Sequence, residues 1–332
     1  MRKNELPSIG VLILNRNGRE WLSPLYDSLL AQDYKNARLY LVDNASEDDS
    51  VELTLEHYPA VKVIRMPRNL GYCMAYNLSM PYAFADGCEW VIWANNDILL
   101  EPGCLEQLAT TAKGDLRIGV IGPAFLEWES EKPNAYMHGN HPAAITAMQQ
   151  FSREPIDVEW VEGSFLMASR ACIESVGPLD PYLFFYWEET DFCRRARYKG
   201  WRVVLAPAAI ARHHAGGWSQ DNEDNKQTAN RLQSRNYYIY KLADPFASFS
   251  RNILNSLHLL LVHIKQCLPK NPSLTLFHFQ VFASIIWELR TVHRKWVRDR
   301  LKEHPPKLPE GVLPVEVEII QGTTRGCLGV KA

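Results

Sequence analysis

The stretch IGVLILNRNGREWL, residues 9–22, decides the fold. It begins as an apolar run, ends that run in the polar group NRNG, and then starts a helical pattern that continues to Leu30. The same order recurs along the chain, with apolar runs at 38–42, 61–65 and 89–93 and helical patterns at 50–57 and 72–84. Strands separated by helices at this rhythm indicate βαβ units. The sequence therefore predicts an α/β fold with a mixed, mainly parallel sheet.

Composition narrows the class of protein further. The chain has 332 residues, 46% hydrophobic and 22% charged, which is ordinary for a globular protein. A formal net charge of −2 argues against nucleic acid as a partner. Seven cysteines form no CxxC pair, and no apolar run reaches the roughly 18 residues that cross a bilayer. We expect a cytoplasmic protein, in contact at most with the inner face of the plasma membrane.

The remainder of the chain divides by composition. Residues 1–125 form the first half of the predicted domain, and residues 126–220 form its second half. The second half starts with an irregular surface excursion over 126–160 and regains strands at 164–168 and 201–205. Residues 221–304 are predicted to be helical, and residues 305–332 to be a loosely ordered tail.

The end of the helical region is basic. Between Glu288 and Lys302 there are six Lys or Arg and two Asp or Glu, a local charge of +4, interleaved with large apolar residues such as Trp296. This pattern favours a helix that lies on an anionic membrane face or contacts another subunit. The alternative is an ordinary packing helix with a solvated basic side.

Polar residues follow several of the predicted strands. The first ends in NRNG, the second in DNASEDDS and the fourth in NND. Because the carboxyl ends of parallel strands open on one edge of a sheet, these groups are expected to line one site. Asp43 there can accept a hydrogen bond from a ribose hydroxyl or a base imide. The alternative is that Asp43, Ser46 and Asp48 only supply turn and N-cap chemistry.

Two common phosphate-binding patterns are absent. The first strand is followed by no GxGxxG, and no GxxxxGK[ST] occurs anywhere, so a dinucleotide-dependent dehydrogenase and a P-loop NTPase both lose support. Phosphates at this edge would need another neutralising group. A divalent cation on Asp97 would supply it, whereas Asn95 and Asn96 are otherwise explained as loop-forming amides.

Two later motifs carry titratable groups. In YWEETDFCRR, the carboxylates Glu188, Glu189 and Asp191 begin a helix directly after an aromatic run. Helix capping explains one or two of them, but an apolar setting also raises a carboxyl pKa and suits it to act as a base. In ARHHAGGWS, His213 and His214 are candidate metal ligands, with surface histidines as the alternative.

These motifs, in this order, resemble the family 2 inverting glycosyltransferases, especially their bacterial rhamnosyltransferase-type members. The resemblance spans about residues 8–240 and includes VLILNRNGREWL, LYLVDNASEDDS, RNLGYCMAYN, WANNDILLEPGCLEQL, VEGSFLMASRACIESVGPLD, the stretch that contains WEETD and HHAGGWS, and SRNYYIYKL. It implies a GT-A fold, a Rossmann-like nucleotide-diphospho-sugar transferase domain, in which residues 1–125 form the nucleotide half and residues 126–220 form the acceptor half.

The resemblance also implies roles for individual residues. Asp43 corresponds to the aspartate that contacts the base, and Asn95 to Asp97 take the place of the DXD motif, with Asn95 in place of its first aspartate. His214, five residues before Ser219, corresponds to the metal-side histidine, and His213 is the second choice. Glu189 corresponds to the catalytic base, ahead of Glu188, while Asp191 helps to fix the helix. The remaining implied nucleotide-binding residues are Asn15, Asn17, Asn44, Ser46, Asn69, Gly71, Asn77 and Asn96.

The implied activity is metal-dependent, inverting transfer of a sugar from a nucleotide-diphosphate donor to a hydroxyl, with magnesium or manganese as the cofactor. The resemblance favours dTDP-rhamnose as donor and a cell-surface polysaccharide or lipid-linked glycan as acceptor. Two other classes stay open. A sugar nucleotidyltransferase would carry a Gly-rich, basic signature after the first strand, where NRNGREWL offers only Gly18. A non-catalytic nucleotide-sugar binding protein would bind the donor without turning it over.

Overall fold

The structure, a computed structural model, describes residues 5–214, 223–267, 272–301, 317–321 and 324–327. The strands are β1 Ile9–Asn15, β2 Ala37–Asp43, β3 Lys62–Arg65, β4 Trp90–Asn95, β5 Ile98–Leu100, β6 Ile118–Leu126, β7 Ile156–Asp157, β8 Phe165–Ser169, β9 Arg202–His213, β10 Glu318–Gln321 and β11 Thr324–Cys327. The helices are α1 Arg19–Leu30, α2 Ser50–His57, α3 Gly71–Ala85, α4 Cys104–Gly114, α5 Ala135–Asn140, α6 Pro142–Gln149, α7 Arg170–Val176, the 3-10 turn η1 Pro181–Leu183, α8 Glu188–Tyr198, α10 Glu223–Leu242, α11 Phe249–Cys267 and α12 Pro272–Leu301.

One mixed sheet organises the molecule. Its strand order is β11-β10-β3-β2-β1-β4-β8-β6-β9-β5, with β7 paired to β9. Strands β3, β2, β1 and β4 are parallel neighbours, and the register places Asn15 beside Asp43 and Leu14 beside Asn95. The predicted α/β architecture is therefore confirmed. The polar residues that follow β1, β2 and β4 lie at one edge, as parallel pairing requires.

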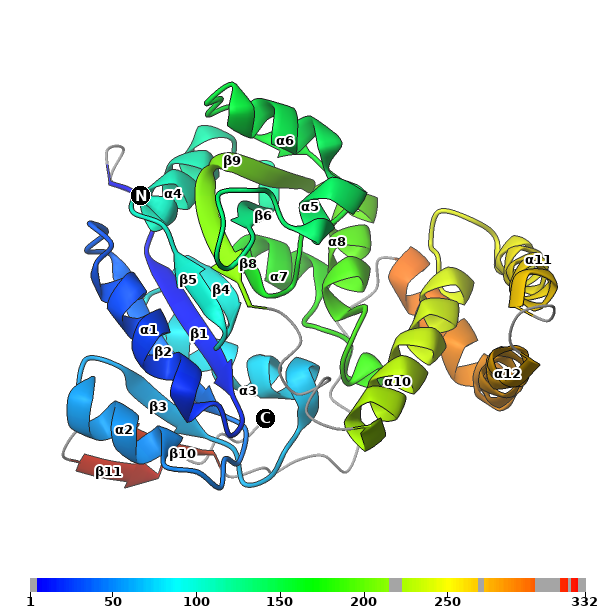
Figure 1. Ribbon diagram of the computed structural model, residues 1–332, viewed down its shortest axis with the longest axis horizontal. Helices are drawn as coiled ribbons and strands as arrows, with labels where there is room; N and C mark the ends of the chain where they lie inside the picture. Colours follow the sequence, from blue (N-terminus) through cyan, green and yellow to red (C-terminus); the bar gives the residue numbers. More distant parts are fainter. Residues whose placement is uncertain (1–4, 215–222, 268–271, 302–316, 322–323, 328–332) are drawn as a thin grey trace.

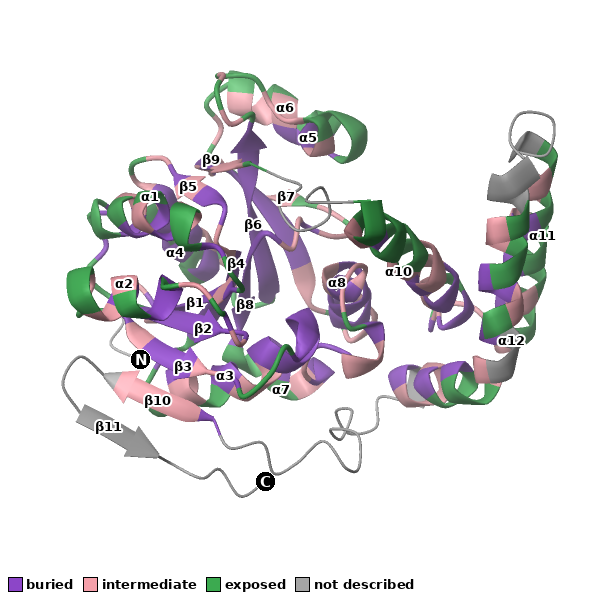
Figure 2. Cartoon of the chain, turned by 60° about the horizontal axis from the view of Figure 1, so that its bottom comes forward, coloured by how far each residue is buried: buried purple, intermediate pink, exposed green. Residues whose placement is uncertain are grey.

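Helices cover both faces of this sheet, as Figure 1 shows. On one face Val11 and Ile13 of β1 pack with Leu25 and other buried residues of α1, α2 and α4. On the other face Leu12 packs with residues of α3, α7 and α8. The alternation of side chains along β1 produces this division, because successive residues of a strand point to opposite faces. Figure 2 shows β1, β2, β4, β6 and β8 as the buried centre of the molecule.

The helices after residue 222 continue the second of these cores. Tyr238 of α10, Leu260 of α11 and Phe282 of α12 belong to the same buried cluster as Leu12. Figure 1 shows α11 and α12 at the end of the molecule away from β1 and β2. Within the part of the chain that the structure describes, no helix has the length and apolarity to cross a membrane.

Within the basic stretch of α12, Lys295 and Trp296 pack against the fold, whereas Arg290 and Arg294 are exposed. Lys295 is 4% exposed and ion-paired to Asp180, Asp191 and Asp299. The indole of Trp296 donates hydrogen bonds to the carbonyls of Asp244 and Ala247. Lys295 and Trp296 therefore do not face a membrane, because groups within the fold take up their polar atoms, whereas a membrane contact of the exposed Arg290 and Arg294 stays a prediction.

Three other expectations are corrected. Residues 318–321 of the predicted loose tail form β10, which pairs antiparallel with the otherwise open edge of β3. The excursion over 126–160 contains two short helices, and the side chain of Asn134 caps the first of them. Strand β9 extends beyond the predicted 201–205 as far as His213, because its second half pairs with β5.

Candidate active site

Asp43, at the end of β2, provides the acceptor expected to contact a nucleotide base. Its side chain is fully buried, and its Oδ1 accepts a hydrogen bond from the backbone N–H of Ser46 at 3.2 Å. Turn chemistry thus accounts for one oxygen. The other, Oδ2, has no hydrogen-bond partner and lies 3.4 Å from the Nε of Arg65. Burial raises the pKa of Asp43, and hydrogen bonds from Ser46 and the charge of Arg65 oppose that rise.

A chain of amide contacts joins Asp43 to the end of β4. The buried amide of Asn15 donates to the hydroxyl of Ser46 at 3.1 Å, and the backbone N–H of Asn17 donates to the same hydroxyl at 3.0 Å. The Nδ2 of Asn96 then donates to the Oδ1 of Asn15 at 2.7 Å. The backbone N–H of Asn95 donates to the carbonyl of Ser164 at 2.8 Å. Residues from three strand ends therefore meet, as predicted.

The segment before α3 joins this group through Asn44. The Nδ2 of Asn44 donates to the Oδ1 of Asn69 at 2.9 Å, and its Oδ1 accepts from the N–H of Leu70 at 2.8 Å. Gly71 has a φ of 73°, and a Cβ there would lie 2.6 Å from the ring of Phe184. Asn77 lies elsewhere: its side chain donates to and accepts from the main chain of Leu179. This contact gives Asn77 a structural role, contrary to the expected nucleotide contact.

Asp97 and His213 face each other at the same edge. The pairing of Ile98 with His213 across β5 and β9 places the imidazole beside Asp97, with its Nε2 3.4 Å from Oδ1. The Nδ1 of His213 lies 2.5 Å from the Oε1 of Glu162. Burial alone would lower the pKa of His213, but hydrogen bonds to Asp97 and Glu162 raise it to about 10. Burial alone would raise the pKa of Asp97, but the contact with His213 lowers it below its ordinary value.

His214, the first choice from the sequence, points elsewhere. Its ring packs on Trp21 at 4.4 Å and on Trp128 at 5.4 Å between centroids, while its backbone N–H donates to the carbonyl of Asp97 at 3.1 Å. Its charge still contributes to the lowered pKa of Asp97. The Gly-Gly step and Ser219 that guided the choice lie in residues 215–222, outside the described residues.

The site suits a divalent cation that retains open positions for phosphate. Among the described residues there is no cluster of three or more His, Cys, Asp or Glu able to hold a metal. Asp97 and His213 would be the residues that hold such a cation, which would supply positive charge toward a diphosphate. The carboxylate of Glu162 behind His213 is the usual outer partner of a metal-binding imidazole. A cation there would replace the proton on the Nε2 of His213, because an imidazole ligates a metal only in its neutral form.

Two adjacent glutamates begin α8. Glu188 is 4% exposed, its Oε2 has no hydrogen-bond partner, and burial followed by the charge of Glu189 raises its pKa well above the ordinary value. Glu189 is only partly buried, and its Oε1 accepts a hydrogen bond from the hydroxyl of Thr190 at 3.2 Å. Burial, assisted by the charge of Glu162, raises the pKa of Glu189 to about 7. Such a group exchanges a proton readily near neutral pH.

Asp191 has a different surrounding. It is fully buried and ion-paired with Arg194, Arg195 and Lys295 at 2.8–3.0 Å. Burial would raise the pKa of Asp191, but these cations lower it strongly. Asp191 is therefore a fixed anion inside α8, as expected for a residue that holds the helix.

Glu162 is the residue that the sequence did not indicate. A Cβ on the next residue, Gly163, would lie 3.2 Å from the Cβ of Glu189, so Glu162 links the His213 side of the site to the base. Glu162 comes just before β8. Because β8 runs antiparallel to β4, the start of β8 lies at the carboxyl end of β4, and Glu162 lies there with it. In an all-parallel sheet it would lie at the opposite edge. An antiparallel assignment for 165–169 would have revealed it.

Solved structures share this fold. The chain superposes on GalNAc-T7 with UDP, GalNAc and Mn2+ with a TM-score of 0.54 and 16% identity, covering 71% of this chain and 48% of the other. For S. aureus TarS, residues 1–349, the TM-score is 0.55 with 12% identity, covering 96% and 98% of the two chains. The fold is therefore that of the GT-A glycosyltransferases.

Sequence comparison then gives the family. Residues 8–171 match the model of glycosyl transferase family 2, and residues 93–256 match that of glycosyltransferase (GlcNAc). N-acetylglucosaminyl-diphospho-decaprenol L-rhamnosyltransferase of Mycobacterium tuberculosis is 30% identical over 200 residues, which are 52% of this chain and 65% of the relative. The dTDP-rhamnosyl transferase RfbF of Shigella flexneri is 23% identical over 190 residues, 55% of this chain and 61% of the relative. The chain thus carries a family 2 glycosyltransferase domain. These matches span just under two thirds of either relative.

Proposed function

We propose that this protein is a metal-dependent, inverting glycosyltransferase that uses a nucleotide-diphosphate sugar. One observation carries the proposal: Asp97, His213 and Glu162 form a linked group, and the segment of Glu162 abuts Glu189. A cation-binding pair suited to a diphosphate therefore adjoins a carboxyl group whose pKa lies near neutrality. A site that only binds a nucleotide sugar has no need of a carboxyl group whose pKa lies near neutrality.

The chain's own residues support a single displacement. Asp43 offers a buried acceptor for the donor's base, and the amides of Asn15, Asn96 and Asn44 surround the strand ends on which the nucleotide would lie. Glu189, when ionised, takes the proton of the acceptor hydroxyl, which attacks the anomeric carbon from the face opposite the leaving diphosphate. A divalent cation held by Asp97 and His213 would stabilise the negative charge on that leaving group. Burial and the charge of Glu189 raise the pKa of Glu188, which favours a neutral Glu188 beside the base.

For the donor and acceptor we favour a deoxyhexose nucleotide, dTDP-rhamnose, and a lipid-linked or cell-surface glycan. Two relatives support this choice, because the names of both specify rhamnosyl transfer and one also names a diphospho-decaprenol acceptor. We further propose peripheral contact with an anionic membrane, through α11 rather than through the basic part of α12. Leu254, Leu257 and Leu261 are 67%, 42% and 64% exposed, and residues 245–287 include no Asp or Glu.

The deciding experiment incubates the protein with a panel of nucleotide sugars, Mn²⁺ or Mg²⁺ and a polyprenyl-diphosphate-linked N-acetylglucosamine that supplies the acceptor hydroxyl, and it measures release of nucleoside diphosphate. We expect release that stops when EDTA removes the cation and that is fastest with one deoxyhexose donor. A nucleotidyltransferase would instead exchange pyrophosphate, and a binding protein would release nothing. Either result would refute the proposed activity, and donor binding measured by calorimetry would separate the two.

A further inference from the structure

The segment that delivers Glu188 and Glu189 has a backbone that its own sequence does not favour. Between η1 and α8, Phe184, Tyr186 and Trp187 have φ values of 41°, 70° and 73°. Residues with a Cβ rarely adopt such left-handed conformations, and they persist only where the surrounding structure imposes them. The position of the two glutamates therefore depends on what holds residues 180–191 in place.

Helix α10 holds the middle of this segment. Asn236 is fully buried, and its Nδ2 lies 2.7, 2.9 and 3.0 Å from the carbonyl oxygens of Leu183, Phe185 and Tyr186. The two N–H donors of one amide group thus contact three main-chain acceptors within the five residues before Glu188, so that one donor is shared. The rings of Tyr237 and Tyr240 also pack on Trp187, at 4.9 and 5.2 Å between centroids.

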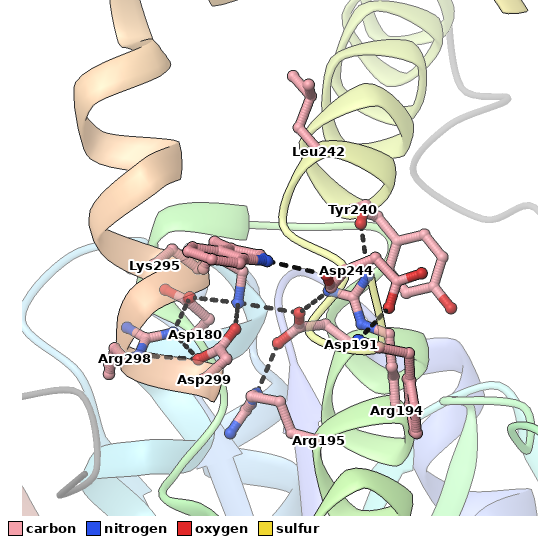
Figure 3. A network of polar contacts seen from close by, with 12 residues as sticks. Asp180, Asp191, Arg194, Arg195, Tyr240, Leu242, Asp244, Lys295, Arg298 and Asp299 are labelled. Atoms are coloured by element: carbon pink, nitrogen blue, oxygen red, sulfur yellow. Dashed lines mark hydrogen bonds and ion pairs between the residues drawn. The ribbon is translucent and has the colours of Figure 1, made fainter. Parts of the chain in front are cut away.

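Helix α12 holds the two ends of the same segment. The Nζ of Lys295 lies 2.9 Å from Asp180, 2.9 Å from Asp191 and 3.0 Å from Asp299, so each of its three protons has a carboxylate. Figure 3 shows this ammonium group between α12 and α8, with Arg298 joining Asp180 to Asp299. Asp180 precedes η1, and Asp191 lies in the first turn of α8. One buried cation therefore connects both ends of residues 180–191.

The side of the segment nearer the sheet is held by α3. The backbone N–H of Tyr72 donates to the carbonyl of Phe184 at 3.0 Å, and Asn77 exchanges two hydrogen bonds with Leu179. The opposite side of the segment contacts α10 and α12. Residues 180–191 are therefore held between α3 on one side and α10 and α12 on the other.

We propose that Asn236 and Lys295 are positioning residues of the transfer reaction, which makes α10 and α12 part of the active site. The inference rests on the proposed function, since it assigns the two residues to the placement of the proposed base. Neither side chain is itself a catalytic group, because both are buried and act through the main chain or through Asp180 and Asp191. Small displacements of a base matter, because about 1 Å of misplacement can cost a hundredfold in rate.

The test compares Asn236→Ala with Asn252→Ala. Asn252, on α11, is 2% exposed and donates to the carbonyls of Leu242 and Asp244, so it matches Asn236 in burial and bonding but does not touch residues 180–191. We expect Asn236→Ala to lower kcat at least roughly tenfold with a donor KM within about twofold of wild type. Asn252→Ala should lose comparable thermal stability and retain kcat. Equal kcat for the two variants at equal stability would overturn the proposal.

Hydrogen exchange gives a second reading that needs no turnover. In Asn236→Ala, and in Lys295→Met combined with Asp299→Asn, which removes one charge of each sign, the amides of residues 183–191 should exchange faster, whereas Asn252→Ala should leave them unchanged. If the wild type releases no nucleoside diphosphate, the proposed activity fails while this measurement still decides the positioning role. Unchanged exchange in Asn236→Ala would refute that role even in an active enzyme.

Discussion

At the scale of single residues, Glu188 and Glu189 differ in burial although they are adjacent. Glu188 is 4% exposed, and burial raises its pKa well above the ordinary value, which favours its neutral form. Glutamine mimics that neutral form closely. Glu188→Gln should therefore retain most activity, whereas Glu189→Gln should lower kcat by roughly 10²–10⁴-fold, the usual contribution of a general base. The measurement is nucleoside diphosphate release at saturating donor. Equal losses in both variants would remove Glu189 from its proposed role.

The raised pKa of Glu189 also predicts a pH dependence. Glu189 must be ionised to accept a proton, so kcat should rise with pH through a midpoint near the pKa of Glu189, about 7. The acidic groups that face Glu189 are Glu188 and Glu162. Stability should change in the opposite direction. The folded state favours the protonated form, so this contribution is complete below the ordinary pKa of 4.5 and is lost as pH rises through about 7.

Glu189→Gln cannot ionise and separates the two effects. Its melting temperature relative to wild type should be higher at pH 8 than at pH 4.5. A kcat profile that is flat between pH 6 and 8, or a stability difference that does not change with pH, would contradict the assignment.

The two histidines provide a direct comparison at the proposed metal site. His213 faces Asp97 at 3.4 Å and Glu162 at 2.5 Å, whereas His214 packs between Trp21 and Trp128. We expect His213→Ala to weaken the apparent affinity for Mn²⁺ by roughly 10- to 100-fold, and His214→Ala to change it by less. Titration of activity with Mn²⁺ after removal of metal by EDTA measures both. The reverse order would restore the assignment made from the sequence.

At the scale of elements, the length of β9 explains why the sequence favoured the other histidine. The apolar pattern indicates a strand over 201–205, but pairing with the short β5 carries β9 on to His213. Such pairing is a tertiary contact and leaves no periodic trace in either segment. The strand ends that hold Asn15, Asp43 and Asp97 were predictable, because parallel pairing follows from the alternation of strands and helices. Glu162 was not, because its position depends on β8 running antiparallel.

The same end of β9 is fastened by Arg212. Its guanidinium bonds to the carboxylates of Glu101 and Glu131 and to the carbonyls of Glu127 and Ser130, all at 2.6–3.0 Å. Arg212→Met would keep the aliphatic stem and remove these bonds. We expect the free energy of unfolding to fall by roughly 1–3 kcal/mol and the apparent affinity for Mn²⁺ to fall with it. Chemical denaturation measures the first effect. A variant as stable as wild type would show that β9 is held by its ladder alone.

At the scale of the whole molecule, charge and exposure divide the C-terminal helices. The inner side of α12 neutralises buried carboxylates, while α11 turns three leucines outward at helical spacing. Between residues 245 and 287 the chain carries Arg251, Lys265 and Lys270 and no acidic residue. An apolar stripe in a purely basic setting suits an anionic lipid surface. Two copies of such a face would repel each other, which makes it less suited to a symmetric dimer.

Vesicle binding tests this division. The protein should sediment with vesicles rich in phosphatidylglycerol and much less with phosphatidylcholine, and 0.5 M salt should weaken the binding because basic residues contribute to it. Replacing Leu254, Leu257 and Leu261 by Ser should weaken binding at least about tenfold, given the apolar area removed from lipid contact. Leu116, 80% exposed in the connection between α4 and β6, provides the control, and Leu116→Ser should bind as wild type does. If the triple variant still binds vesicles but loses a dimer, α11 is a subunit contact. If vesicles fail to bind the wild type at low salt, the membrane role of α11 is excluded, and its exposed leucines would need a protein partner.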